Sequence, residues 1–233
     1  MPVRAISFDL DDTLWDTAPV MQRAEETIHT WLVRHYPRVA QRYDVAALHA
    51  LREQMASEDP ARAWDFTHLR RRLFRRLARE AGYPEAEFSA QAWEVYFAAR
   101  HRVTFFHDVL PVLEELAHRF PLVAVSNGNA DISHLGLDHL FRFALSASDI
   151  GQPKPAPAIY TETCARLALP PAQVMHVGDH PEHDILGAAR AGLRTVWLNR
   201  RRQRWPNDVA VMPDAEITDL HALPALLGTT AGG

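Results

Sequence analysis

Three acidic residues have the type and spacing to carry out chemistry together. Asp9 directly follows the apolar segment AISF, Asp11 comes two positions later, and Asp179 ends the segment QVMHVGD. Three carboxylates in one site would repel one another unless a cation lay among them. Oxygen ligands of this kind suit Mg²⁺, which uses few carboxylates together with water and substrate phosphate. We therefore expect these acids to form a magnesium site.

A second group of polar residues could bind a phosphoryl group. Ser126 and Asn127 end the segment LVAVSN, and the backbone N–H groups of Asn127 and Gly128 could donate to phosphoryl oxygens. Lys154 lies in the rigid segment QPKPAP and is the only lysine among 25 Lys and Arg residues. A lysine supplies a compact positive charge that matches a phosphate.

The segments around these residues predict the elements that position them. Short apolar segments alternate with helical patterns, which is typical of a doubly wound parallel sheet in an α/β fold. In such sheets ligands bind at the carboxyl ends of the strands, where most of the polar residues named above fall. The strands are expected at 5–8, 122–127, 143–148, 173–179 and 195–199, and the helices at 109–120, 156–167 and 181–191.

Between the first strand and the rest, the pattern is helical throughout. Apolar residues recur at helical spacing, and turn signals such as Asp59-Pro60 and Gly82-Tyr83-Pro84 separate the stretches. We expect residues 1–16 and 104–233 to form the α/β catalytic core and residues 17–103 an inserted helical cap. The helices of the insert are expected at 20–36, 45–55, 69–81 and 90–99. The arginines between Arg70 and Arg76 would spread around one of them as a solvated surface.

Composition excludes some classes of protein. The formal net charge of −4 argues against a nucleic-acid binder, and the single cysteine, Cys164, excludes an internal disulfide. The apolar run near the first residue is too short for a signal peptide or a membrane span. We expect a cytoplasmic monomer or homodimer with no nucleic-acid or membrane partner.

Four segments, FDLDDTLWD, VSN, GQPKPAP and GDHPEHD, resemble the four motifs of the haloacid dehalogenase superfamily in order and spacing. The helical insert resembles the type 1 cap of that superfamily. The resemblance implies a Rossmann-like core and a Mg²⁺-dependent phosphatase that acts on a small phosphomonoester. The segments VSNGN and MHVGD further resemble bacterial phosphatases that act on flavin mononucleotide or on a ribityl-aminopyrimidine phosphate of riboflavin synthesis.

The resemblance also implies a role for each motif residue. Asp9 would attack phosphorus and form an aspartyl-phosphate, while Asp11 would act as general acid and then as general base. Mg²⁺ would be held by Asp9, the backbone carbonyl of Asp11, and Asp179, and Asp184 would orient metal-bound water or Lys154 without binding the metal itself. Lys154, Ser126 and Asn127 would bind the phosphate, and Lys154 would also assist catalysis.

Other functions fit parts of the same pattern. A haloacid dehalogenase shares the fold but needs no equivalent of Asp11, whereas a phosphosugar mutase shares all four motifs. A phospho-receiver signalling module also has an acidic pair and a lysine, but it is shorter and lacks a helical insert. A zinc site at His176, His180 and His183 is less favoured, since the oxygen ligands already present suit Mg²⁺. The sequence leaves the physiological substrate open.

Overall fold

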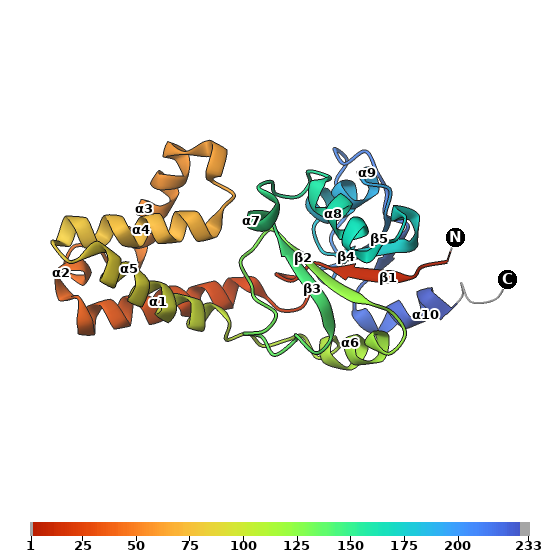
Figure 1. The fold of residues 1–233 in the computed structure, drawn as a ribbon, viewed down its shortest axis with the longest axis horizontal. Coiled ribbons are helices and arrows are strands. Elements are labelled where there is room, and N and C mark those ends of the chain that lie inside the picture. Colours follow the sequence, from red (N-terminus) through yellow and green to blue (C-terminus); the bar gives the residue numbers. More distant parts are fainter. Residues whose placement is uncertain (1, 229–233) are drawn as a thin grey trace. The chain divides into compact units, whose positions relative to one another are not determined.

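The computed structural model describes residues 2–228, which divide into two compact units (Figure 1). The divisions fall between Asp16 and Thr17 and between Val103 and Thr104. We call residues 17–103 the helical unit and the remainder the core unit.

The core unit is built on a parallel sheet of six strands in the order β3-β2-β1-β4-β5-β6. Every pairing is parallel, and β1 lies between β2 and β4, with Phe8 opposite Ala124 on one side and Val177 on the other. The strands are β1 (Ala5–Phe8), β2 (Leu122–Ser126), β3 (Phe141–Ser146), β4 (Val174–Gly178), β5 (Arg194–Leu198) and β6 (Ala215–Ile217).

Helices cover both faces of this sheet, so its central strands are buried. All residues of β1, β2 and β4 are buried, which accounts for their nearly continuous apolar sequences. In Figure 1, α6 and α10 lie on one face while α8 and α9 lie on the other. The doubly wound α/β fold is confirmed. The helices are α6 (Val109–Ala117), α7 (Ala147–Ile150), α8 (Ala158–Leu167), α9 (Gly187–Arg190) and α10 (Leu223–Gly228), with short helical turns η2 (Pro171–Gln173), η3 (Pro181–Leu186) and η4 (Leu220–Ala222).

The strand order reverses at β1. The chain adds β2 and β3 on one side of β1 and then β4, β5 and β6 on the other. In doubly wound sheets, the crevice at this reversal is where ligands bind, outside the carboxyl ends of the strands. The loops that follow β1, β2 and β4 therefore meet at the expected binding edge.

The helical unit has a hydrophobic core of its own. Ile28 and Leu32 of α1 pack in one cluster with Leu73 and Leu77 of α4 and Phe88 of α5. Residues 17–103 are all described, and they form helices and turns without a strand. Its elements are α1 (Thr17–His35), α2 (Pro37–Ala40), α3 (Val45–Glu58), η1 (Pro60–Arg62), α4 (Phe66–Ala81) and α5 (Glu85–Arg100). Over residues 2–228, no helix has both the length and the apolar character needed to cross a membrane.

Arg70 differs from the solvated surface predicted for its helix. Its side chain is only 3% exposed, and both terminal nitrogens donate to Glu25, at 2.5 and 3.1 Å. The guanidinium also lies 4.1 Å from the ring centre of Tyr96. The sequence did not reveal this burial because the partners come from α1 and α5, not from neighbours in the sequence.

The helix predicted over 181–191 is divided in two. Pro181–Leu186 forms a π-helical turn, and only Gly187–Arg190 is α-helical. Turns of this wider kind are frequent at functional sites. The sixth strand, β6, was not predicted.

Candidate active site

Two neighbouring strands bring the main acids together. Asp9 follows β1 and Asp179 follows β4, and the backbone N–H of Asp9 donates to the carbonyl of Val177 at 2.9 Å. Asp184, in the turn η3, joins them. Each of the three acids offers a carboxylate oxygen, and these oxygens all lie within 4.8 Å of one another.

Lys154 supplies the positive charge at this cluster. Its side chain is 2% exposed, and Nζ donates to Oδ1 of Asp9 and Oδ1 of Asp184, both at 2.6 Å. A third bond goes to the carbonyl of Val125 at 3.1 Å, so all three N–H donors of the ammonium are used. Lys154 thus joins the loops that follow β1 and β4 to the end of β2.

Asn127 fixes the backbone of Lys154 from two sides. Its Oδ1 accepts from the Lys154 N–H at 2.7 Å, and its Nδ2 donates to the Lys154 carbonyl at 3.1 Å. The amide therefore sets the direction in which the lysine enters the site. The phosphate-binding role that we expected for Asn127 stays a prediction.

Burial and crowding shift the ionisation of these acids. Burial raises the pKa of Asp9 well above its usual value, and Asp184 and Asp179 add to this while Lys154 opposes it. Burial, then Asp184 and Asp12, raise the pKa of Asp179 to about 7. Burial would also raise the pKa of Asp184, but Lys154 and His176 more than offset it and the pKa is lowered. Asp184 is therefore the ionised partner of Lys154, while Asp9 and Asp179 hold protons more readily than ordinary aspartates.

The loop after β1 carries Asp11 beside this cluster. Oδ1 of Asp11 accepts from Nε1 of Trp15 at 3.1 Å, so the side chain is held without joining the three clustered carboxylates. Thr13 is fully buried, and its hydroxyl donates to Oδ1 of Asp179 at 3.1 Å. This contact is not local to the loop, because the two residues lie 166 positions apart in the sequence.

Ser126 lies at the end of β2 and is buried. Its Oγ accepts from the backbone N–H of Gly128 at 2.9 Å. We had expected this N–H to be a donor for phosphate, and here it is turned toward the serine instead. The hydroxyl proton of Ser126 can still rotate toward a ligand.

The close approach of Asp184 depends on Gly178. A Cβ at position 178 would lie 2.3 Å from Cγ of Asp184, closer than any real contact. The other carboxylate oxygen of Asp184, Oδ2, accepts from the backbone N–H of His180 at 2.9 Å. Glycine at the end of β4 thus lets the π-helical turn fold its acid back over the strand.

His176 has a role that sequence reasoning missed. It is fully buried on β4, with Nε2 3.2 Å from Oδ1 of Asp184 and Nδ1 2.9 Å from Oγ of Ser7. Burial lowers the pKa of His176, so the imidazole is neutral, and the ionised Asp184 can only accept. Nε2 therefore carries the proton, and Nδ1 accepts from Ser7. The only sequence signal was a polar residue in an otherwise apolar strand.

The residues fit a divalent cation. Three carboxylates meet with one ammonium in a buried place, and burial, with the neighbouring acids adding to it, raises the pKa values of Asp9 and Asp179. An all-oxygen donor set matches Mg²⁺. Asp9 and Asp179 were both predicted as ligands. Asp184 was predicted only to support the site, but in the structure one of its carboxylate oxygens lies within 4.8 Å of carboxylate oxygens of Asp9 and Asp179.

Comparison with known proteins identifies the family. The model of the haloacid dehalogenase-like hydrolases matches residues 3–192, and the chain belongs to this family. The parallel sheet with helices on both faces agrees with the Rossmann-like core that the resemblance implied.

The most similar relatives include phosphatases. The 5-amino-6-(5-phospho-D-ribitylamino)uracil phosphatase YigB of Escherichia coli K12 is 32% identical over 97% of this chain and 96% of its own length. Glyceraldehyde 3-phosphate phosphatase of Methanopyrus kandleri is 29% identical over 92% of this chain and 93% of its own length. These relatives confirm the prediction that the chain is a phosphatase.

A similar solved structure carries a different description. It is described as a 2-haloacid dehalogenase from Pseudomonas syringae pv. Tomato DC3000, and it is 40% identical with a TM-score of 0.89. The match covers 98% of this chain and 100% of that one.

Proposed function

We propose that this protein hydrolyses the phosphate ester of a small metabolite, with Mg²⁺, through an aspartyl-phosphate on Asp9. The observation that carries the proposal is the cluster of Asp9, Asp179 and Asp184 around Lys154 at the carboxyl edge of the sheet. Asp9 and Asp179 would hold Mg²⁺ together with the backbone carbonyl of Asp11. When bound, the cation would neutralise charge between the nucleophile and the substrate phosphate.

The first step would be attack on phosphorus. Lys154 holds Oδ1 of Asp9, so we assign the attack to Oδ2. As the new P–O bond forms, the ester P–O bond breaks, and the leaving oxygen takes a proton from Asp11. Ser126, and Asn127 through Lys154, would hold the phosphoryl group in line.

The second step would release phosphate. Asp11, now ionised, would take a proton from water while the water oxygen attacks phosphorus. The bond between phosphorus and Asp9 would break, and free Asp9 and inorganic phosphate would result. Asp184 and His176 would keep Lys154 in place through both steps.

For substrate, we propose a ribityl-aminopyrimidine phosphate or flavin mononucleotide. The support is the similarity to the Escherichia coli enzyme, which extends over nearly the full length of both chains. A panel of phosphate esters with Mg²⁺ tests this. Specificity constants tenfold or more higher for hexose phosphates would contradict the choice.

Dehalogenation is a second candidate, and the 40% identity to the Pseudomonas syringae protein favours it. That reaction would use Asp9 on carbon and would need neither Asp11 nor Mg²⁺. Halide release from a 2-haloacid in the presence of a chelator would support it. Phosphate release that stops with the chelator would support the phosphatase.

Substitution of Asp11 tests the proposed roles most directly. Asp11→Asn should slow cleavage of an alkyl phosphate by ~10²–10⁴-fold, because an alkoxide leaves poorly without a proton. An aryl phosphate has a good leaving group, so its first step should be slowed far less, and phosphoenzyme should accumulate. Rapid quench and mass spectrometry would locate the phosphate on Asp9, and Asp9→Asn should trap none. Equal losses with both substrates, or phosphate on another residue, would overturn the assignment.

A further inference from the structure

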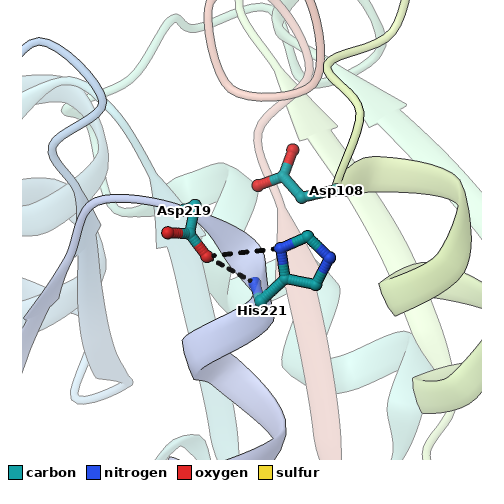
Figure 2. Close-up of side chains that lie close together, drawn as sticks. All are labelled: Asp108, Asp219 and His221. Carbon is teal, nitrogen blue, oxygen red and sulfur yellow. Dashed lines mark hydrogen bonds and ion pairs between the residues drawn. The ribbon is translucent and has the colours of Figure 1, made fainter.

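A second set of potential ligands lies in the core unit, away from the clustered acids. Figure 2 shows Asp108, Asp219 and His221 facing one another, and one ligand atom of each lies within 4.8 Å of the others. Asp219 and His221 are about half exposed, but Asp108 is fully buried. Oδ2 of Asp108 already accepts from the backbone N–H of Leu220 at 2.6 Å and from Nη1 of Arg200 at 2.9 Å. The positive charge that pairs with the buried Asp108 carboxylate is therefore supplied by Arg200 of the same chain.

The same arginine reaches the loop that carries Asp9 and Asp11. Nε of Arg200 donates to the carbonyl of Thr13 at 3.1 Å. The guanidinium lies 4.2 Å from the ring centre of Phe106, and the side chain is only 14% exposed. One planar group therefore connects the loop after β1 with the residues that precede α6.

The carbonyl of Thr13 is one of two consecutive backbone carbonyls in this loop that accept a hydrogen bond from a distant part of the core unit. The carbonyl of Leu14, the next residue, accepts from the backbone N–H of Phe106 at 3.0 Å. Thr13 also donates its hydroxyl to Asp179. If the backbone of Thr13 shifted, the loop that carries Asp9 and Asp11 would therefore move with it. The Thr13 hydroxyl that bonds to Asp179 would also move.

We propose that Arg200, oriented by Asp108, is a positioning residue that holds the loop from Asp9 to Thr13 in its catalytic geometry. The inference rests on the proposed phosphatase function, because it needs Asp9 and Asp11 to be the reacting groups. Arg200 acts through Thr13 and does not touch the substrate.

Stability alone does not explain this ion pair. A buried pair gains little net stability because both charges lose their water, and a hydrophobic replacement often does as well. Among the described residues, Oδ1 of Asp108 and Nη2 of Arg200 are buried without a hydrogen-bond partner, which raises that cost further. Burial would raise the pKa of Asp108, but Arg200 and the N–H of Leu220 more than offset it and the pKa is lowered. The acid thus stays ionised and keeps the arginine oriented.

The geometry requires a guanidinium and not simply a positive charge. Nε and Nη1 point in fixed directions from one plane, toward Thr13 and Asp108. The ammonium of a lysine is a point charge on a flexible stem and cannot reproduce this fork. Arg200→Lys therefore separates positioning from charge.

The test compares Arg200→Lys with Arg204→Lys, which makes the same change at an exposed arginine of the same loop. With an alkyl phosphate, Arg200→Lys should lower kcat by about 10²-fold, since small misplacements of reacting groups have effects of this size. KM should change by less than about threefold if substrate binding is untouched. Arg204→Lys should match the wild type in both. A wild-type kcat in Arg200→Lys, with unchanged melting temperature, would overturn the proposal.

A second variant covers the case in which Arg200→Lys is simply less stable. Arg200→Ala leaves room for a small planar cation, so guanidinium at millimolar concentration should restore kcat on the order of tenfold, while ammonium should not. Equal recovery with both cations, or none with either in folded protein, would contradict the inference. Phosphoenzyme on Asp9 of the wild type is measured in parallel. Its absence would refute the phosphatase proposal itself, whereas its presence with an unaffected Arg200→Lys would refute only the role of Arg200.

Discussion

At the scale of single residues, the arrangement of charge around Lys154 decides what the site can bind. One ammonium serves Asp9 and Asp184, while Asp179 has a hydroxyl, from Thr13, as its side-chain partner. Against the effect of burial, Lys154 and His176 lower the pKa of Asp184, whereas burial keeps the pKa values of Asp9 and Asp179 raised. The cluster thus contains one ion pair, between Lys154 and Asp184, and two further acids, Asp9 and Asp179, whose ionised forms a cation would stabilise.

This division predicts a pH dependence of Mg²⁺ affinity. Burial and the neighbouring acids Asp184 and Asp12 raise the pKa of Asp179 to about 7, so Mg²⁺ must displace a proton below that pH. Affinity should rise with pH up to about 7 and then level off. Between pH 6 and pH 8 the Kd should fall roughly tenfold, the effect of one proton, or more if Asp9 also loses one.

Titration calorimetry of Mg²⁺ without substrate measures this directly. Asp179→Asn removes the titrating group and should bind more weakly with a flatter pH profile. An equal Kd for the wild type at pH 6 and pH 8 would show that neither acid holds a proton in competition with the metal.

At the scale of elements, the end of β4 and the turn η3 together set the position of Asp184. Gly178 leaves the space into which Asp184 folds, and Asp184 then meets Lys154 and His176. We expect Gly178→Ala to push Asp184 away, to destabilise the protein by about 1–3 kcal/mol through overpacking, and to lower kcat by about 10²-fold. Urea unfolding and steady-state kinetics measure the two effects.

Gly228→Ala is the matched control. Among residues 2–228, a Cβ at that position of α10 meets no atom within 4 Å, and alanine favours a helix over glycine. The control should keep full activity and be equal or slightly higher in stability. If Gly178→Ala behaved in the same way, the close approach of Asp184 would not be needed.

The elements also show which features the sequence can predict. Strands β1, β2 and β4 are buried apolar segments that end in polar residues, so both the fold and the meeting of Asp9 with Asp179 were predictable from local pattern. The strand β6 has only three residues, with an exposed Glu216 in the middle, and gave no such pattern.

Contacts between distant residues were not predictable. Arg200 reaches Thr13 across 187 positions, and Arg70 meets Glu25 across 45. Nothing in the local sequence distinguishes these two arginines from the exposed ones nearby. The sequence likewise gave no signal that the Asn127 side chain would hold the backbone of Lys154.

At the scale of the whole molecule, two units with separate hydrophobic cores share one chain that crosses between them twice. Within the helical unit, Glu25 receives Arg70 and, at 2.8 Å, Arg52. Burial would raise the pKa of Glu25, but these arginines more than offset it and the pKa is lowered. This stabilisation is present above the unfolded pKa of about 4.5 and is lost as pH falls through the lower folded value.

Removal of this carboxylate should weaken the helical unit alone. Glu25→Gln leaves Arg70 buried without its ion pair and should cost roughly 3–5 kcal/mol. Hydrogen exchange should become faster in residues 17–103 and stay unchanged in the strands of the core unit. Glu26→Gln, at the exposed neighbouring position, is the control and should change neither. Equal acceleration in both units would mean that they unfold as one.

The burial of Lys154 has a consequence for the labelling chemistry of the folded protein. It is the only lysine of the sequence, its side chain is 2% exposed, and all three N–H donors of its ammonium are engaged. Burial would lower the pKa of Lys154, but Asp184 and Asp9 more than offset it and the pKa is raised, so the neutral amine that acylating reagents attack is scarce. Such reagents therefore find no reactive side-chain amine while the core unit is folded. Acylation of Lys154 would count the molecules in which that unit has opened, so the chain carries its own single-site reporter of unfolding.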